Sequence, residues 1–216
     1  HAWPSFHYVI VSVQAVADHY LAVISGLRTK PAVIGHSFGG LLVQKIADEG
    51  AASASVAIDN APIKGVLPLP ISALKSGLPV LRNPANRGKA ITLTFDQFTY
   101  GWANNLDDAE ARTLYDTHHV PASGLPLFQA GFANFNFGRD TAVDVKNPDR
   151  GPLLIISGTK DNTAPRAFTH GSYRKQLKNP EVTEYVEVAD RGHSLVIDHG
   201  WPEVADIALQ FVKRFL

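Results

Sequence analysis

Residues 30–40 of this 216-residue chain, which read KPAVIGHSFGG, decide its fold. A short β-branched run leads into Gly-His-Ser-Phe-Gly, and a segment with helical spacing follows it up to Gly50. Gly-x-Ser-x-Gly between a strand and a helix is typical of a sharp turn that lifts a serine hydroxyl above the end of a sheet. We expect glycine on both sides of Ser37, because side chains there would collide with neighbouring elements. The stretch predicts a strand–turn–helix unit with Ser37 as a candidate nucleophile.

Strand and helix patterns alternate on both sides of this turn. Apolar spacing predicts a helix over 13–27, and residues 41–49 form the helix after the turn. Strands are expected at 30–34, 55–59, 153–156 and 182–188, and an amphipathic helix closes the chain over 202–216. The run 6–13 is compatible with a further strand. This order predicts an α/β fold with a mostly parallel sheet flanked by helices.

Residues 62–140 differ in character from the rest of the chain. Prolines cluster in their first part and aromatic residues in their second, and no strand pattern is present. So long a stretch inside a compact domain is either a functional lid or a linker, and its apolar content favours a lid. We therefore expect one domain over 1–216, with a core of 1–61 and 141–216 and an inserted cap over 62–140.

A serine hydroxyl needs a histidine base to act as a nucleophile, and an acid must hold that base in the useful tautomer. His193 lies after the last predicted strand, in the sequence DRGHS. Asp161 follows the strand 153–156, in SGTKDNTAP, while Asp59 ends the strand 55–59 and competes for the same role. Catalytic groups of α/β sheets collect beyond the carboxyl ends of the strands, where both aspartates are expected. Asp161 is the preferred acid.

Composition excludes several classes of function. Twenty basic residues balance twenty acidic ones, which argues against a dedicated nucleic-acid binder. No apolar run reaches the roughly 18 residues that a membrane span requires. The chain has no cysteine, which excludes disulfides, thiolate metal sites and cysteine nucleophiles. It also has no methionine, even at position 1, so we expect it to be part of a longer protein.

The chain resembles the α/β-hydrolase superfamily, and within it bacterial esterase-like serine hydrolases. The stretches KPAVIGHSFGGLLVQ, KNPDRGPLLIISG and EVADRGHSLVIDHGWPEVAD carry the likeness, which extends from about residue 13 to the C-terminus. The resemblance implies Ser37 as nucleophile, Asp161 as acid and His193 as base. It also implies that 62–140 is a helical cap over the active site.

The chain departs from the family at its N-terminal end. Family members begin with further strands, and the loop after the first of these supplies one oxyanion-hole N–H. Here the Phe38 N–H is the donor that can be identified, and loss of one such donor costs on the order of 2.7–4 kcal/mol. We therefore expect a missing N-terminal segment or a second chain to complete the sheet.

The remaining candidate residues concern the substrate pocket and cofactors. Aromatic residues of the insertion are expected either to line a pocket or to pack the cap on the core. The pocket candidates are His36, Phe98, Trp102, Phe128 and Phe132. His118 and His119 are adjacent and lack a carboxylate cluster, so no metal site is expected. No nucleotide-binding motif is present, and no cofactor is expected.

These patterns predict a serine hydrolase that cleaves a small-molecule carboxylic ester or related acyl bond. One alternative is a cofactor-free perhydrolase or haloperoxidase, which uses a similar Ser–Asp–His set. Another is a non-catalytic ligand-binding protein of the same fold. We expect no nucleic-acid partner and no membrane span, and we favour the cytoplasm although no signal fixes the compartment.

Overall fold

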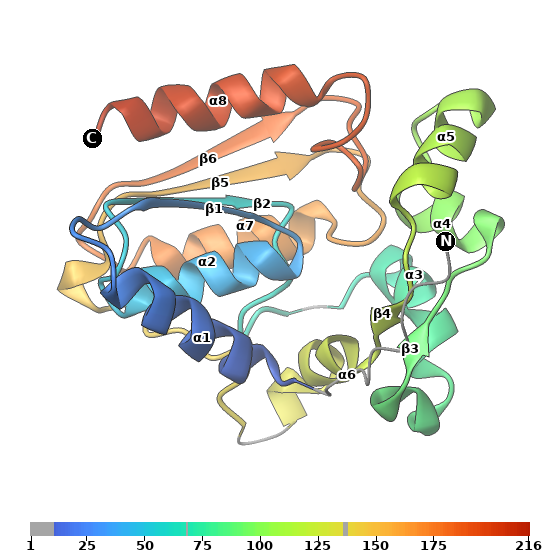
Figure 1. The fold of residues 1–216 in the computed structure, drawn as a ribbon, viewed down its shortest axis with the longest axis horizontal. Coiled ribbons are helices and arrows are strands. Elements are labelled where there is room, and N and C mark those ends of the chain that lie inside the picture. Colours follow the sequence, from blue (N-terminus) through green and yellow to red (C-terminus); the bar gives the residue numbers. More distant parts are fainter. Residues whose placement is uncertain (1–10, 68, 136–137) are drawn as a thin grey trace.

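A four-stranded parallel sheet forms the centre of the computed structural model, which describes residues 11–67, 69–135 and 138–216 (Figure 1). The strand order is β1-β2-β5-β6, and each neighbouring pair is parallel. The strands are β1 (Ala32–His36), β2 (Ala54–Ile58), β5 (Leu153–Gly158) and β6 (Thr183–Val188). The predicted α/β fold with a parallel sheet is confirmed.

Helices cover both faces of this sheet. α1 (Val13–Ser25), α2 (Phe38–Asp48) and α7 (Arg166–Gln176) lie on one face, and α8 (Trp201–Lys213) lies on the other (Figure 1). Every residue of β2 and β5 is buried, as their apolar sequences require. Their side chains alternate between a cluster with α8 and a cluster under α2, so the two central strands join both halves of the core.

The segment between β2 and β5 contains α3 (Ile71–Leu81), α4 (Phe95–Gly101), α5 (Asp108–His118) and α6 (Leu125–Gly131). Short 3-10 turns occur at Pro84–Gly88, Ala133–Phe135 and Pro148–Arg150. These four helices gather at the end of the sheet where the strands finish (Figure 1). The expectation of no strands here is wrong, because β3 (Ala90–Ile91) pairs with β4 (Ala122–Ser123). Strands of two residues are too short to show alternation in sequence.

The start of the described chain belongs to α1. Ser12 caps this helix by accepting a hydrogen bond from the Ala15 N–H, and Val13 is buried. Most of the run 6–13 lies outside the described residues. β1 is an outer strand of the sheet, and its Ile34 is 55% exposed. Within the described ranges, no helix is long and apolar enough to cross a membrane.

Candidate active site

Ser37 lies between β1 and α2 in a backbone conformation that few non-glycine residues adopt, with φ 57° and ψ −119°. A Cβ at Gly35 would overlap the carbonyl of Gly39, so glycine is required there. A Cβ at Gly39 would meet nothing within 4 Å, so the expected requirement for glycine at that position is wrong. Glycine is required at position 40 instead, because a Cβ there would lie 2.7 Å from Asn60 Cβ. Close packing of α2 on the end of β2 sets this requirement.

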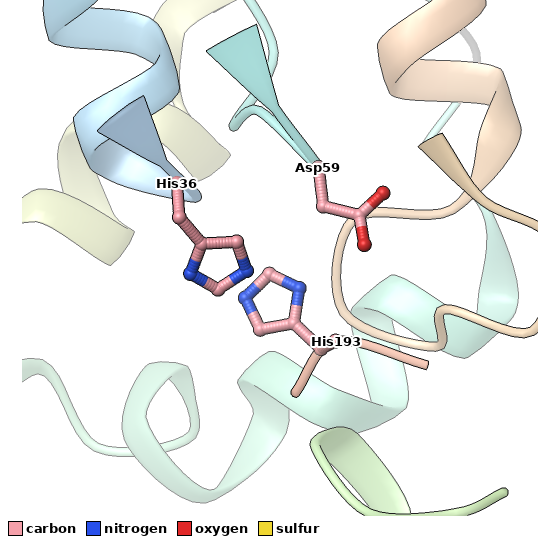
Figure 2. A group of neighbouring side chains, drawn as sticks. All are labelled: His36, Asp59 and His193. Atoms are coloured by element: carbon pink, nitrogen blue, oxygen red, sulfur yellow. The ribbon is translucent and has the colours of Figure 1, made fainter. Parts of the chain in front are cut away.

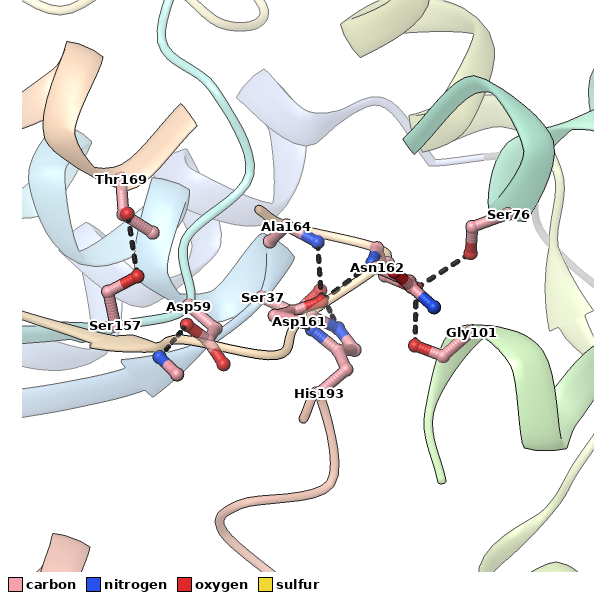
Figure 3. Close-up of polar contacts among 12 residues, drawn as sticks. Ser37, Asp59, Ser76, Gly101, Ser157, Asp161, Asn162, Ala164, Thr169 and His193 are labelled. Carbon is pink, nitrogen blue, oxygen red and sulfur yellow. Dashed lines mark hydrogen bonds and ion pairs between the residues drawn. The ribbon is translucent and has the colours of Figure 1, made fainter. Parts of the chain in front are cut away.

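The structure brings Ser37, His193 and Asp161 together at the carboxyl ends of three strands (Figure 3). His193 Nε2 lies 2.9 Å from Ser37 Oγ, and His193 Nδ1 lies 2.6 Å from Asp161 Oδ2. The side chains of His193 and Asp161 are fully buried. With Asp161 ionised, Nδ1 donates to the carboxylate and Nε2 accepts from the serine hydroxyl. In this assignment the unprotonated ring nitrogen of His193 faces the Ser37 hydroxyl.

Asp161 uses its two carboxylate oxygens for different purposes. Oδ1 accepts hydrogen bonds from the Thr163 and Ala164 N–H groups at 2.6 and 2.8 Å, which closes the turn after β5. Oδ2 faces His193. Burial by itself would raise the pKa of Asp161, but the charge of His193 and hydrogen bonds from His193, Asp59 and Ala164 lower that pKa below its ordinary value. Asp161 is therefore an ionised partner for the imidazole.

Asp59, the competing acid, is buried at the end of β2 and does not hold the imidazole. Its Oδ1 accepts a hydrogen bond from the Gly158 N–H at 2.8 Å, while Oδ2 has no donor among the described residues. Burial and the neighbouring charge of Asp161 raise the pKa of Asp59 well above its ordinary value. The sequence preferred Asp161 but left Asp59 as a competitor, because both follow strands that end at the same edge of the sheet.

Two aromatic side chains contact the ring of His193. The ring centroids of His36 and His193 lie 4.5 Å apart, and those of Trp102 and His193 lie 4.5 Å apart at 80°. Burial and the nearby charge of His193 lower the pKa of His36 to about 3, so His36 is neutral at neutral pH. The Trp102 carbonyl also accepts a hydrogen bond from the Ser194 N–H. These contacts restrict the orientation of the imidazole.

The other predicted pocket residues lie in the insertion. Phe98 is buried among Ala103, Ala111 and Leu114, and its ring stacks on Trp102 with centroids 6.1 Å apart. Phe128 and Phe132 stack on each other near the end of α6, and 52% of Phe132 is exposed. Among the described rings, neither contacts His193.

The Phe38 amide is at the first position of α2, where an N–H has no acceptor inside the helix. It directly follows Ser37, so this donor is adjacent to the serine hydroxyl in the chain. Its position fits the oxyanion role that the sequence suggested.

Hydrogen bonds join the insertion to the loops that carry Asp161 and His193. These contacts were not predicted from the sequence. The adjacent residues Asn104 and Asn105 are the local signal that could have indicated them. The side-chain bonds to backbone run from Asn104 to Lys160, Asn105 to Asp190, Asn162 to Tyr100 and Thr163 to Gly101. Ser76 of α3 also bonds Thr163 at 2.7 Å. The insertion is thus anchored to both loops.

One group of side chains has atoms that a metal ion could use. Single ligand atoms of His36, Asp59 and His193 all lie within 4.8 Å of one another (Figure 2). Both ring nitrogens of His193 are already engaged by other residues. Of the adjacent pair His118 and His119, His119 uses Nε2 to accept a hydrogen bond from a backbone N–H.

The family comparison agrees with this fold. The model of the alpha/beta hydrolase family matches residues 3–207, so the chain belongs to that family. The resemblance inferred from sequence is confirmed, and the fold is the α/β-hydrolase fold. No curated protein sequence matches the chain.

Solved structures share the fold at low sequence identity. A monoacylglycerol lipase from Paleococcus ferrophilus is 21% identical with a TM-score of 0.56, over 94% of this chain and 76% of that one. A meta-cleavage product hydrolase from Pseudomonas fluorescens is 16% identical with a TM-score of 0.61, over 99% and 75%. A candidate non-heme bromoperoxidase from Mycobacterium tuberculosis is 16% identical with a TM-score of 0.62, over 95% and 75%. At these identities the likeness establishes the fold alone.

Proposed function

We propose that this protein is a serine hydrolase that cleaves a carboxylic ester or related acyl bond. The observation that carries the proposal is the continuous chain of contacts from Ser37 Oγ through His193 to Asp161, at 2.9 and 2.6 Å. A nucleophile in hydrogen-bond contact with a base, which is itself oriented by an acid, is the arrangement that activates a serine hydroxyl.

In the first half of the reaction, His193 Nε2 takes the proton of Ser37 while Oγ attacks the substrate carbonyl. Asp161 stabilises the imidazolium that forms and keeps Nδ1 protonated throughout. His193 then gives its proton to the leaving alcohol, and an acyl-enzyme remains on Ser37. In the second half, His193 deprotonates a water molecule, which attacks the acyl-enzyme, and then returns that proton to Ser37 Oγ as the acid is released.

The oxyanion that develops on the substrate needs hydrogen-bond donors. We assign the Phe38 N–H as one of them, because it follows Ser37 directly and lies at the N-terminus of α2. The helix dipole favours negative charge at this position. We further propose that the insertion over 62–140 is a cap that covers this end of the sheet and supplies the apolar walls of the acyl pocket.

A fluorophosphonate probe tests this proposal directly, because it reacts with activated serines. We expect the wild-type protein to be labelled and to hydrolyse p-nitrophenyl esters. Ser37→Ala should lose the label and lower kcat/KM by about 10⁴-fold or more. Ser25→Ala, which alters an exposed serine at the end of α1, is the matched control and should retain both properties.

Absence of labelling on the folded wild-type protein, together with ester hydrolysis equal to that of Ser37→Ala, contradicts the enzyme proposal. That result favours a non-catalytic ligand-binding protein. Peptide mapping of the labelled protein must also place the probe on Ser37.

A perhydrolase is the second candidate, since one of the structural neighbours is a candidate bromoperoxidase. The same three side chains could support perhydrolysis if hydrogen peroxide replaced water as the attacking nucleophile. Bromination measured with acetate and peroxide, compared with ester hydrolysis by the same preparation, distinguishes the two activities.

A further inference from the structure

Asp59 is a buried carboxyl group that the proposed mechanism does not use. It follows β2, and in Figure 3 it lies next to the group formed by Ser37, Asp161 and His193. Asp59 is fully buried, and its backbone has φ 38°, a value that non-glycine residues rarely adopt. Such a conformation persists only where the surrounding structure holds it.

The hydrogen-bond donors around the two carboxyl groups are unequal. Asp161 accepts from three N–H groups, those of Thr163, Ala164 and the His193 ring. Asp59 accepts from one, the Gly158 N–H, and its Oδ2 has no donor among the described residues. Both carboxyl groups lie beside the His193 ring: an Asp59 oxygen is within 4.8 Å of a ring nitrogen, and Asp161 Oδ2 is 2.6 Å from Nδ1. A hydrogen bond between the two carboxyl groups is consistent with the raised pKa of Asp59 and the lowered pKa of Asp161. Two carboxylates cannot form that bond, because both accept and neither donates.

One proton on the pair of carboxyl groups removes this conflict, because the protonated group can donate to the ionised one. Asp161 has more donors and the imidazole beside it, so the negative charge is more stable on Asp161. The proton therefore belongs on Asp59 Oδ2, where it gives that oxygen a hydrogen bond to make. Among the described residues, His36 and His193 each have a ring nitrogen within 4.8 Å of an Asp59 carboxyl oxygen, and neutral His36 supplies no positive charge to stabilise an ionised Asp59.

We propose that Asp59 is protonated at neutral pH and donates a hydrogen bond to Asp161, so that the pair carries one negative charge. Asp59 is then a positioning residue that holds the acid in place behind His193. This inference rests on the proposed function for its effect on catalysis, while the protonation of Asp59 can be tested without substrate.

A cation bound by His36, Asp59 and His193 would also satisfy the free oxygen of Asp59 (Figure 2). Such a cation would need a ring nitrogen of His193, and both nitrogens are engaged by Ser37 and Asp161. A proton on Oδ2 satisfies the oxygen without breaking either contact. The structure therefore favours the proton.

Carbon-13 NMR of protein labelled at the aspartate side-chain carboxyl carbons measures this proton in the wild-type chain. We expect one aspartate resonance at the chemical shift of a protonated acid at pH 7, absent from Asp59→Asn and unchanged by dialysis against EDTA. The proposal is overturned if all aspartates show ionised shifts, or if the protonated signal appears only after EDTA has removed a bound ion. The wild-type spectrum alone tests whether an aspartate is protonated, even if Asp59→Asn does not fold.

The pH profile of kcat/KM tests the positioning role. In Asp59→Asn the new amide can still accept from the Gly158 N–H and donate to Asp161, so this variant should keep the acidic limb at the wild-type pH. The leucine side chain of Asp59→Leu can neither accept from the Gly158 N–H nor donate to Asp161. Loss of the hydrogen bond to the charged Asp161 should lower kcat/KM by about 10- to 100-fold. An ionised Asp59 predicts otherwise: its removal in Asp59→Asn would shift the acidic limb down by about one to three pH units.

Failure of the proposed function and failure of this inference remain distinguishable. Loss of probe labelling bears on Ser37 alone, whereas the NMR spectrum reports the proton on Asp59 whether or not the protein hydrolyses an ester. A protein that is labelled at Ser37 but shows no protonated aspartate keeps the proposed function and loses the inference.

Discussion

At the scale of the residue, Ser37 shows how the site departs from ordinary backbone geometry. Its φ of 57° and ψ of −119° lie where β-carbon contacts disfavour most residues, at a cost of about 1–3 kcal/mol. The backbone of the turn is held at both ends, since the Ser37 N–H donates to Ile58 O and the Ser37 carbonyl accepts from the Ala61 N–H. Hydrogen bonds to residues at the end of β2 and just beyond it thus maintain the strained turn.

We predict that Ser37→Gly is more stable to unfolding than Ser37→Ala by about 1 kcal/mol. Both variants lack the hydroxyl, so the comparison isolates backbone strain from the bond to His193. Urea denaturation of the two purified variants gives the difference. An alanine variant as stable as the glycine variant would mean that the turn is not strained.

The raised pKa of Asp59 gives a second prediction, concerning stability and pH. The folded protein keeps the Asp59 proton above the ordinary pKa of 3.8, while the unfolded chain releases it. The free energy of unfolding should therefore fall for the wild type relative to Asp59→Asn as pH rises from about 4 to 7, by up to about 1.4 kcal/mol per pH unit. Asp161 has the opposite dependence but is present in both proteins. Parallel stability curves would contradict the raised pKa.

Sequence reasoning located Ser37, Asp161 and His193 because each lies directly after a recognisable strand. It preferred Asp161 but left Asp59 as a competitor, since the difference lies in the donors that reach each carboxyl group. Those donors come from the turn after β5 and from a histidine 32 residues further along the chain. It also placed the second essential glycine at 39 instead of 40, because the packing of α2 on Asn60 has no local signature.

At the scale of the element, the loop between β6 and α8 is fitted closely against the insertion. A Cβ at Gly192 would overlap Asn105 Oδ1 and lie 3.0 Å from Asn104 Oδ1. Asn105 in turn donates to the Asp190 carbonyl at 3.1 Å. The residue next to His193 therefore has no room for a side chain while Asn105 is in place.

We predict that Gly192→Ala displaces His193 and lowers kcat/KM by about 10- to 100-fold. The double variant Gly192→Ala/Asn105→Ala should recover part of that loss, because the shortened side chain makes room for the methyl group. A double-mutant cycle with Asn105→Ala as the control measures the coupling. Purely additive effects would show that the clash is relieved elsewhere.

Elements were predictable to different degrees. The buried strands β2 and β5 are short, mostly apolar runs and the amphipathic helices α1 and α8 have helical periodicity, and their predicted positions hold within a few residues. The helices of the insertion are short and separated by prolines and 3-10 turns, so their boundaries did not emerge from the pattern. The β3–β4 ribbon joins residues about thirty positions apart, and only the fold brings them together.

At the scale of the whole molecule, one end of the sheet collects the three side chains that the proposed mechanism uses. Ser37, Asp161 and His193 follow β1, β5 and β6, so three separate stretches of chain must fold before the site exists. The insertion adds a fourth contribution through Trp102, whose ring and carbonyl both contact the His193 loop. The candidate site therefore depends on the sheet and on the insertion together.

The hydrogen bonds between residues 100–105 and the loops around Asp161 and His193 limit how the insertion can move. A lid that moved on a hinge could open and leave Ser37, Asp161 and His193 undisturbed. Here the bonds that secure the insertion are made to the loops that carry Asp161 and His193, so moving this part of the insertion away would disturb both loops. Any movement of residues 100–105 is therefore coupled to the positions of Asp161 and His193.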